Sequence, residues 1–163
     1  MDAQQQKILI YIALVALFIG GFIYLIDRPP GSIYLLPVRE MPISWQINLL
    51  GSEDYLPSFF HVYSFILLTS VCLLSTNSQL IIICLFWFVI DSLFEIAQIE
   101  YIAQQIALSI GNQFDGFPIL ENIVPYFVNG IFDLADIYSI TLGTLAAYIT
   151  VLYIKNRHKG ELA

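Results

Sequence analysis

The fold of this chain is decided by ILIYIALVALFIGGFIYLI, residues 8–26, which contains no charged residue. A helix needs about 20 apolar residues to cross the hydrocarbon core of a bilayer, so this stretch is long enough to span one. A cleavable signal peptide has a shorter apolar core of ~7–15 residues, followed by small residues. Here Asp27, Arg28 and two prolines follow instead, and we therefore expect a retained membrane helix.

Three further apolar stretches extend this prediction to the whole chain. Hydrophobic residues make up 58% of the sequence and charged residues 12%, whereas soluble domains have ~45–50% and ~25%. We expect an all-α integral membrane protein, a four-transmembrane-helix bundle in a single membrane domain, residues 1–163. The expected helices and tail are residues 8–26, 59–74, 79–108 and 130–154, followed by a cytoplasmic tail over 155–163.

Two long connections are unusual for so small a bundle. Residues 27–58 and 99–129 are rich in Pro, Gly and aromatic side chains, and loops of this length are uncommon unless they are functional or disordered. Their apolar content argues against disorder. We expect two apolar outer loops that pack at the membrane interface, with a lid or a partner surface as the alternatives.

The charge pattern predicts the orientation and excludes one class of partner. The net charge of −7 argues against nucleic acid, which requires basic patches. Basic residues are more frequent on the side of the two termini than in the first long loop, and the second loop has none. The positive-inside rule then places both termini in the cytoplasm. The terminal side has Lys7, Lys155, Arg157 and Lys159, and the first loop has Arg28 and Arg39.

Ionisable residues inside apolar spans are the strongest functional signal. Such residues cost several kcal/mol on insertion scales and indicate a functional site. With this orientation, all of them fall at one depth, the outer leaflet and its interface. Spacings of three, four and seven residues place the members of each span on one helical face. The ionisable residues are His61 in the second span, Asp91 and Glu95 in the third, and Asp133 and Asp136 in the fourth; the polar Gln98 shares the face of Asp91 and Glu95.

We expect His61, Glu95 and Asp136 to converge as catalytic residues, with Glu95 or His61 as a general base. Asp91, Gln98, Asp133 and Tyr63 are then expected to bind substrate or to complete a polar network. In plainer structural roles, His61 and Asp133 would cap helices and Asp91 would make a polar packing contact.

Four carboxylates cannot all stay charged together in a site of low dielectric constant. Some would be protonated, or His61 would be charged and pair with Glu95 or Asp136. Alternatively, a divalent cation, Mg²⁺ or Ca²⁺, would bind Glu95, Asp133 and Asp136. No sequence motif for an organic cofactor is evident. The two cysteines, Cys72 and Cys84, are expected to be buried apolar residues.

Three short motifs in this order resemble the VanZ-like family. They are Phe60-His61-Val62-Tyr63-Ser64-Phe65, then Glu95-Ile96-Ala97-Gln98, then Phe132-Asp133-Leu134-Ala135-Asp136 with Gly143. The resemblance covers spans two to four, about half of the chain. The chain departs from the family in three places. It has Pro57 and Ser58 where the family often has an Asp-Lys pair, Gly130 where it often has Arg, and Ile140 where it often has Asn.

The resemblance implies a bacterial inner or plasma membrane and a role in the cell envelope. For this family a role in lipid head-group or lipid-linked phosphate chemistry has been proposed, and His61, Glu95, Gln98, Asp133 and Asp136 are the residues that match its motifs. Membrane lipids are the partners expected first. The alternative is a non-catalytic accessory subunit of a larger assembly of integral membrane subunits, with the acids as a structural network. A proton relay through the same carboxylates is a third hypothesis.

Overall fold

The computed structural model describes residues 1–27, 55–73, 76–111, 113–114, 116–117 and 120–157. These residues form α-helices and one short 3₁₀ helix, and no strand occurs among them, so the all-α prediction is confirmed. Four of the helices are long and apolar enough to cross a membrane. The elements are α1 (Ala3–Asp27), α2 (Tyr55–Cys72), α3 (Asn77–Ile96), α4 (Glu100–Ile110), η1 (Leu120–Asn122), α5 (Ile123–Asn129) and α6 (Leu134–Arg157).

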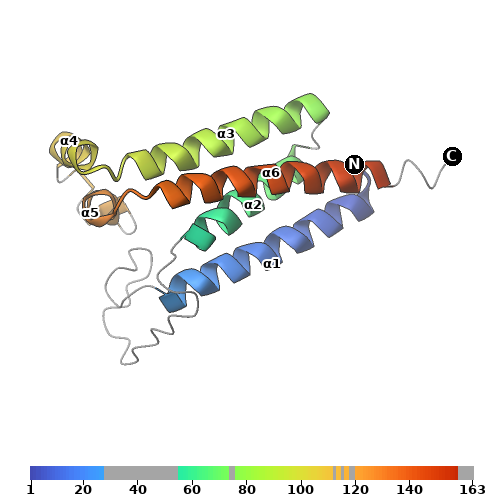
Figure 1. Cartoon of the computed structure of the whole chain (residues 1–163), viewed down its shortest axis with the longest axis horizontal. Coiled ribbons are helices and arrows are strands. Elements are labelled where there is room, and N and C mark those ends of the chain that lie inside the picture. The colour runs from blue at the N-terminus through green and yellow to red at the C-terminus, as the bar shows by residue number, and fades with distance from the viewer. Residues whose placement is uncertain (28–54, 74–75, 112, 115, 118–119, 158–163) are drawn as a thin grey trace.

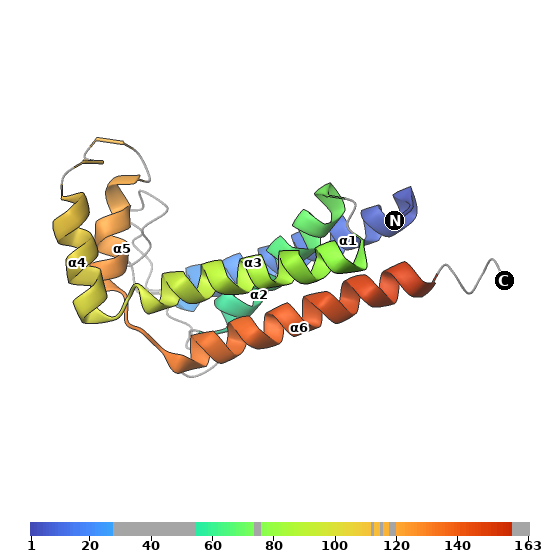
Figure 2. The same cartoon turned by 90° about the horizontal axis from the view of Figure 1, so that it is seen from above.

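The four long helices α1, α2, α3 and α6 form an elongated bundle in which α2 is the central member (Figure 1). α2 packs against each of the other three, and α3 also packs against α6. The N-terminus of α1 and the C-terminus of α6 lie at the same end of the bundle (Figures 1 and 2). There the side-chain amide of Gln5 donates to the carbonyl oxygen of Ile154 at 3.1 Å, which ties the first helix to the last.

The core of the bundle is apolar and lies around α2. Most of its buried side chains are aliphatic, and the outward faces of the same helices are apolar as well, as expected for helices surrounded by lipid. The first outer loop predicted over residues 27–58 lies largely outside the described residues. The core cluster includes Leu9, Val62, Ile66, Leu67, Leu80, Ile140, Ala147 and Val151.

α2 and α6 approach closely at Gly143, which is buried. A Cβ atom added at this position would lie 2.6 Å from Val62 Cγ1 and 2.7 Å from the carbonyl oxygen of Phe59. Real Cβ atoms do not come so close. Small residues at helix interfaces let backbones approach in membranes, where packing drives helix association. Gly143 therefore fixes the position of α6 against the part of α2 that carries His61.

A capping box begins α3 directly after the turn from α2. The backbone N–H of Thr76 donates to Gln79 Oε1 at 2.8 Å, and the backbone N–H of Gln79 donates to Thr76 Oγ1 at 3.3 Å. These two hydrogen bonds satisfy backbone N–H groups at the start of α3 and so fix where the helix begins. Near this turn Cys72 is exposed, whereas Cys84 is buried. The prediction of burial is thus wrong for Cys72, because it faces outward in the last turn of α2.

The single helix expected over residues 79–108 is in fact two helices. α3 ends at Ile96, and α4 begins at Glu100 with a different direction. In Figure 1 the long helices run across the view, whereas α4 and α5 are seen nearly end-on. No proline or glycine occurs between Ile96 and Glu100, so side-chain contacts rather than a helix-breaking residue account for the change of direction.

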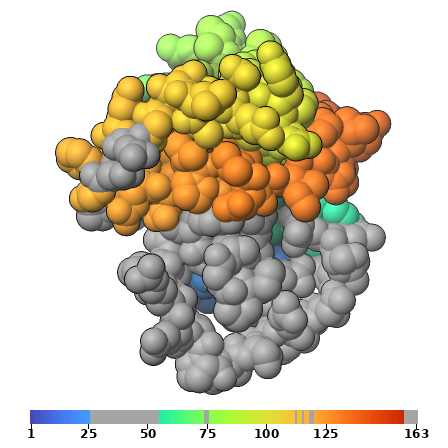
Figure 3. Space-filling view, turned by 90° about the vertical axis from the view of Figure 1, so that its left-hand side faces the viewer, coloured from blue at the N-terminus to red at the C-terminus, as the bar shows by residue number. Residues whose placement is uncertain are grey.

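α4 and α5 pack together as a helical hairpin at the end of the bundle where α3 ends and α6 begins (Figures 2 and 3). Phe94 at the end of α3 contacts Phe127 of α5, with ring centroids 5.7 Å apart. After Gly130 the chain runs without helical structure to α6, which begins at Leu134 rather than at residue 130 as expected. The second long connection is therefore largely helical.

Candidate functional site

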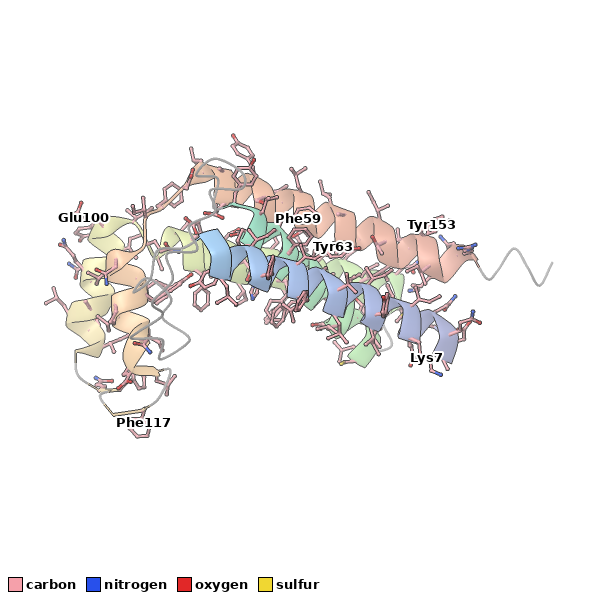
Figure 4. The ribbon with its side chains drawn as sticks, turned by 90° about the horizontal axis from the view of Figure 1, so that it is seen from below. Lys7, Phe59, Tyr63, Glu100, Phe117 and Tyr153 are labelled. Atoms are coloured by element: carbon pink, nitrogen blue, oxygen red, sulfur yellow. The ribbon has the colours of Figure 1, made fainter. Side chains whose placement is uncertain are left out.

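The predicted site residues other than Tyr63 lie at the end of the bundle beside the α4–α5 hairpin. α2 begins there, α3 ends there and α6 begins there (Figure 2). We call this the acidic end, defined by Asp91, Glu95, Asp133 and Asp136. The lysine and arginine side chains of the described residues lie at the opposite end, where Lys7 and Tyr153 are labelled in Figure 4. Between Arg39 and Lys155 the only basic residue of the sequence is His61.

Glu95 is buried, with 7% of its surface exposed. Its Oε1 accepts the backbone N–H of Asp133 at 2.8 Å. Its Oε2 accepts the side-chain amide of Gln98 at 3.2 Å, and the same amide nitrogen lies 3.4 Å from the hydroxyl of Tyr126 on α5. Glu95 therefore joins the end of α3 to the chain that enters α6, and Gln98 extends this connection to the hairpin.

Gly130 makes room for Gln98. A Cβ atom at Gly130 would overlap Oε1 of the Gln98 side chain. Glycine at this point of the connection between α5 and α6 allows the backbone to lie directly against the amide. The contacts of Gln98 with Glu95, Tyr126 and Gly130 lie at the point where α3 gives way to α4. They provide a physical reason for the helix break at residues 97–99.

Asp133 and Asp136 begin α6. Oδ1 of Asp133 accepts the backbone N–H of Ala135 at 2.9 Å, which is the helix-capping role that we considered as its plainer alternative. Asp136 lies in the first turn of α6 and accepts a short hydrogen bond from the hydroxyl of Ser58 on α2. A carboxylate in the first turn also interacts favourably with the helix dipole. Asp136 thus joins α6 to α2.

His61 and Asp91 form the third connection, between α2 and α3. Nδ1 of His61 lies 3.3 Å from Oδ2 of Asp91, and the two side chains are 48% and 10% exposed. Beneath the imidazole, the ring of Phe65 lies 4.4 Å away between centroids, and Trp87 of α3 lies 4.8 Å from Phe65. The pair is thus a half-exposed imidazole, oriented by a largely buried carboxylate and supported by aromatic rings.

Tyr63 lies apart from these acids. Its hydroxyl is 3.2 Å from Thr150 Oγ1 of α6, and its ring stacks on Phe59 with centroids 5.9 Å apart (Figure 4). Thr150 lies nearer the terminal end than Asp136 does, by about four turns of α6. Tyr63 therefore contributes a separate polar contact between α2 and α6.

The structure thus arranges the predicted residues as neighbouring pairs at one end. His61 engages Asp91, Glu95 engages Gln98 and the backbone of Asp133, and Asp136 engages Ser58. In the described part of the chain, no three His, Cys, Asp or Glu side chains are placed to hold a metal ion. The Mg²⁺ or Ca²⁺ site at Glu95, Asp133 and Asp136 stays a prediction.

Sequence reasoning missed Ser58 and Tyr126 as members of this network. Ser58 precedes His61 by three residues, so both lie on adjacent turns of α2, and this spacing was the available signal. Tyr126 had no such signal, because it lies on a helix that was expected to be a loop. Comparison with protein-family models, with curated proteins and with solved structures finds no match to this chain.

Proposed function

We propose that this chain is a VanZ-like membrane protein that binds, and acts on, a lipid head group or lipid-linked phosphate at the outer leaflet of a bacterial plasma membrane. The observation that carries the proposal is the pairing of His61 Nδ1 with Asp91 Oδ2 at 3.3 Å, with half of the imidazole exposed. The chemistry of this pair is that of an oriented acid–base group at the mouth of an apolar bundle.

The geometry suits proton transfer at the other ring nitrogen. A carboxylate that accepts from Nδ1–H fixes the tautomer and orientation of an imidazole, which leaves Nε2 to take or give a proton. Asp91 would act as the positioning residue and His61 as the acid–base group. Glu95 and Asp136 support the pair by holding α3, α6 and α2 together around it.

Phosphate recognition would rest on His61. It is the only basic residue between Arg39 and Lys155, and Glu95 and Asp133 already accept backbone N–H groups at the start of α6. Of the described residues, a phosphate at this site would therefore meet one imidazole rather than an arginine or lysine cluster.

The test uses purified protein in liposomes that contain phosphatidylglycerol and a polyprenyl diphosphate, with head-group or phosphate release followed by ³¹P NMR. We expect His61→Gln to lower turnover by ~10²-fold or more, the usual effect of removing a general acid or base. Asp91→Asn should lower turnover less, because Nε2 remains. Gln105→Ala, an exposed change on α4, serves as the control. Turnover in His61→Gln equal to that of the parent protein would contradict the proposal.

The second candidate is an accessory subunit of a larger membrane assembly. It is favoured by exposed apolar side chains on the hairpin, Tyr101 and Leu108, which lie on one face of α4. It is also favoured by the way Asp91, Glu95 and Asp136 each connect two parts of the bundle. Native mass spectrometry in mild detergent distinguishes the two candidates, since a retained lipid supports the first and a retained protein subunit supports the second.

A further inference from the structure

A groove runs beside the hairpin, between α4 and the connection from α5 to α6. Its volume is about 590 Å³, within the ~300–1,000 Å³ typical of small-molecule sites. It lies at the acidic end of the bundle, beside the point where α3 gives way to α4. The residues that define its two walls and floor are Gln98, Glu100, Ala103, Gln104, Val128 and Ile131.

Two kinds of surface line this groove. One wall has the side-chain amides of Gln98 and Gln104 and the carboxylate of Glu100, with Gln104 Nε2 lying 3.4 Å from Glu100 Oε1. The other wall is apolar and leads outward through Val128 to Ile131, which is 84% exposed. This combination matches an amphiphile with a small polar head and a hydrocarbon chain.

The charge of the groove restricts the head group. Among the described residues, its lining includes a carboxylate and no basic side chain, so a phosphate or sulfate would meet repulsion there without a compensating cation from these residues. Amide and carboxylate oxygens accept hydrogen bonds, and amide nitrogens donate them. A hydroxyl group does both, so a head group with free hydroxyls and no charge suits Glu100, Gln104 and the Oε1 atom of Gln98 best. The amide nitrogen of Gln98 is already engaged by Glu95 and Tyr126.

We infer that this groove binds an uncharged, hydroxyl-bearing lipid of the monoacylglycerol type. The head group lies against Gln98, Glu100 and Gln104, and the chain leaves along Val128 and Ile131 towards the lipid-facing sides of the bundle. Ala103, only 2% exposed, forms the floor of the groove, and its small side chain leaves the space above it open. Gly130 leaves room for the Gln98 amide. The inference is independent of any acid–base role of His61.

The experiment uses the full chain in phosphatidylcholine nanodiscs with a monoacylglycerol that carries a photoactivatable diazirine on its chain. Crosslinked peptides are identified by mass spectrometry. We expect labelling to concentrate on residues 99–103 and 128–132, and excess unlabelled monoacylglycerol to abolish it. Phosphatidic acid with the same chain should compete at least tenfold less well, because it adds an anionic phosphate.

Matched variants test whether the groove itself holds the lipid. Ala103→Trp fills the floor and should lower labelling at least tenfold. Ala107→Trp, one turn further along α4 and outside the groove, should leave labelling unchanged. Should Ala103→Trp fail to fold, Val128→Trp fills the groove from its half-exposed wall. Labelling spread evenly over the spanning helices, labelling that survives both groove-filling variants, or equal competition by phosphatidic acid would overturn the inference.

Discussion

At the scale of single residues, each carboxylate of the acidic end has an identified hydrogen-bond partner. Glu95 is the most constrained, because its two oxygens accept from the backbone of Asp133 and from Gln98. A buried donor that loses its acceptor costs about 1–3 kcal/mol, whereas a hydrogen bond that is merely weakened costs about 1 kcal/mol or less. The network should therefore respond differently to isosteric and to apolar substitution.

We predict that Glu95→Gln lowers the free energy of unfolding by about 1 kcal/mol, because the amide oxygen can still accept from Asp133 and Gln98 can turn its own amide. Glu95→Leu should cost about 2–5 kcal/mol, since it leaves both donors without this acceptor in an apolar setting. Denaturant titration in detergent micelles measures both. Equal stability of the two variants would contradict the hydrogen-bonding role of Glu95.

Much of this site could be predicted from sequence, but its pairings could not. The common depth of His61, Glu95 and Asp136 follows from span order, and the shared face of Glu95 and Gln98 follows from helical spacing. Which carboxylate meets which donor depends on the rotation of α2 and α6 about their own axes. That rotation is set by contacts such as Gly143 against Val62, which one sequence does not reveal. His61 therefore pairs with Asp91, where Glu95 or Asp136 was expected.

At the scale of helices, the contact of α2 with α6 depends on the missing side chain at Gly143. We predict that Gly143→Ala lowers the free energy of unfolding by about 1–3 kcal/mol, the usual cost of overpacking. Gly21→Ala on α1 is the matched control, because an added Cβ there meets nothing within 4 Å and alanine favours helix by about 1 kcal/mol. Thermal midpoints in detergent should fall for the first variant and hold or rise for the second.

The break between α3 and α4 was not predictable from local sequence, because residues 96–100 contain no helix breaker. Long-range contacts of Gln98 and Phe94 with the hairpin override the helical periodicity that runs through the segment. A continuous helix would separate Leu93 and Leu108 by about 22 Å along its axis, given the rise of 1.5 Å per residue.

We predict a clearly shorter distance between spin labels at these two exposed positions, Leu93→Cys and Leu108→Cys, in a protein whose native cysteines are replaced by alanine. Double electron–electron resonance measures it. The pair Leu142→Cys and Arg157→Cys, with the same sequence separation within α6, provides the continuous-helix reference. Equal distances in the two pairs would mean that α3 and α4 form one helix.

At the scale of the whole molecule, charge is segregated along the bundle axis. The described Lys and Arg residues, Lys7, Lys155 and Arg157, lie at the terminal end, and His61 and the acids of the site lie at the other. The positive-inside rule assigns the terminal end to the cytoplasm. With this predicted orientation, the candidate site would lie on the outer face.

We predict that Phe117→Cys, in a protein without native cysteines, reacts with an impermeant maleimide added outside intact cells. A protein that retains only Cys72, which is exposed near the α2–α3 turn, should react only after the cells are opened. A gel shift measures the labelling of each protein in intact and in opened cells. The opposite pattern would place the acidic end in the cytoplasm. It would contradict the part of the proposed function that locates the site at the outer leaflet.

The end of α3 at Ile96 also makes the protein sensitive to bilayer thickness. α3 has 20 residues, which corresponds to about 30 Å, the thickness of an average hydrocarbon core. Because the helix ends at Ile96 and the chain turns aside there, α3 would not lengthen its apolar span by sliding, and α6 with its 24 residues would tilt to match it. A thicker bilayer would draw His61 and Asp91 into hydrocarbon, whereas a thinner one would leave them at the interface. Hydrophobic mismatch would thus restrict this protein to membranes whose lipids have chains of matching length.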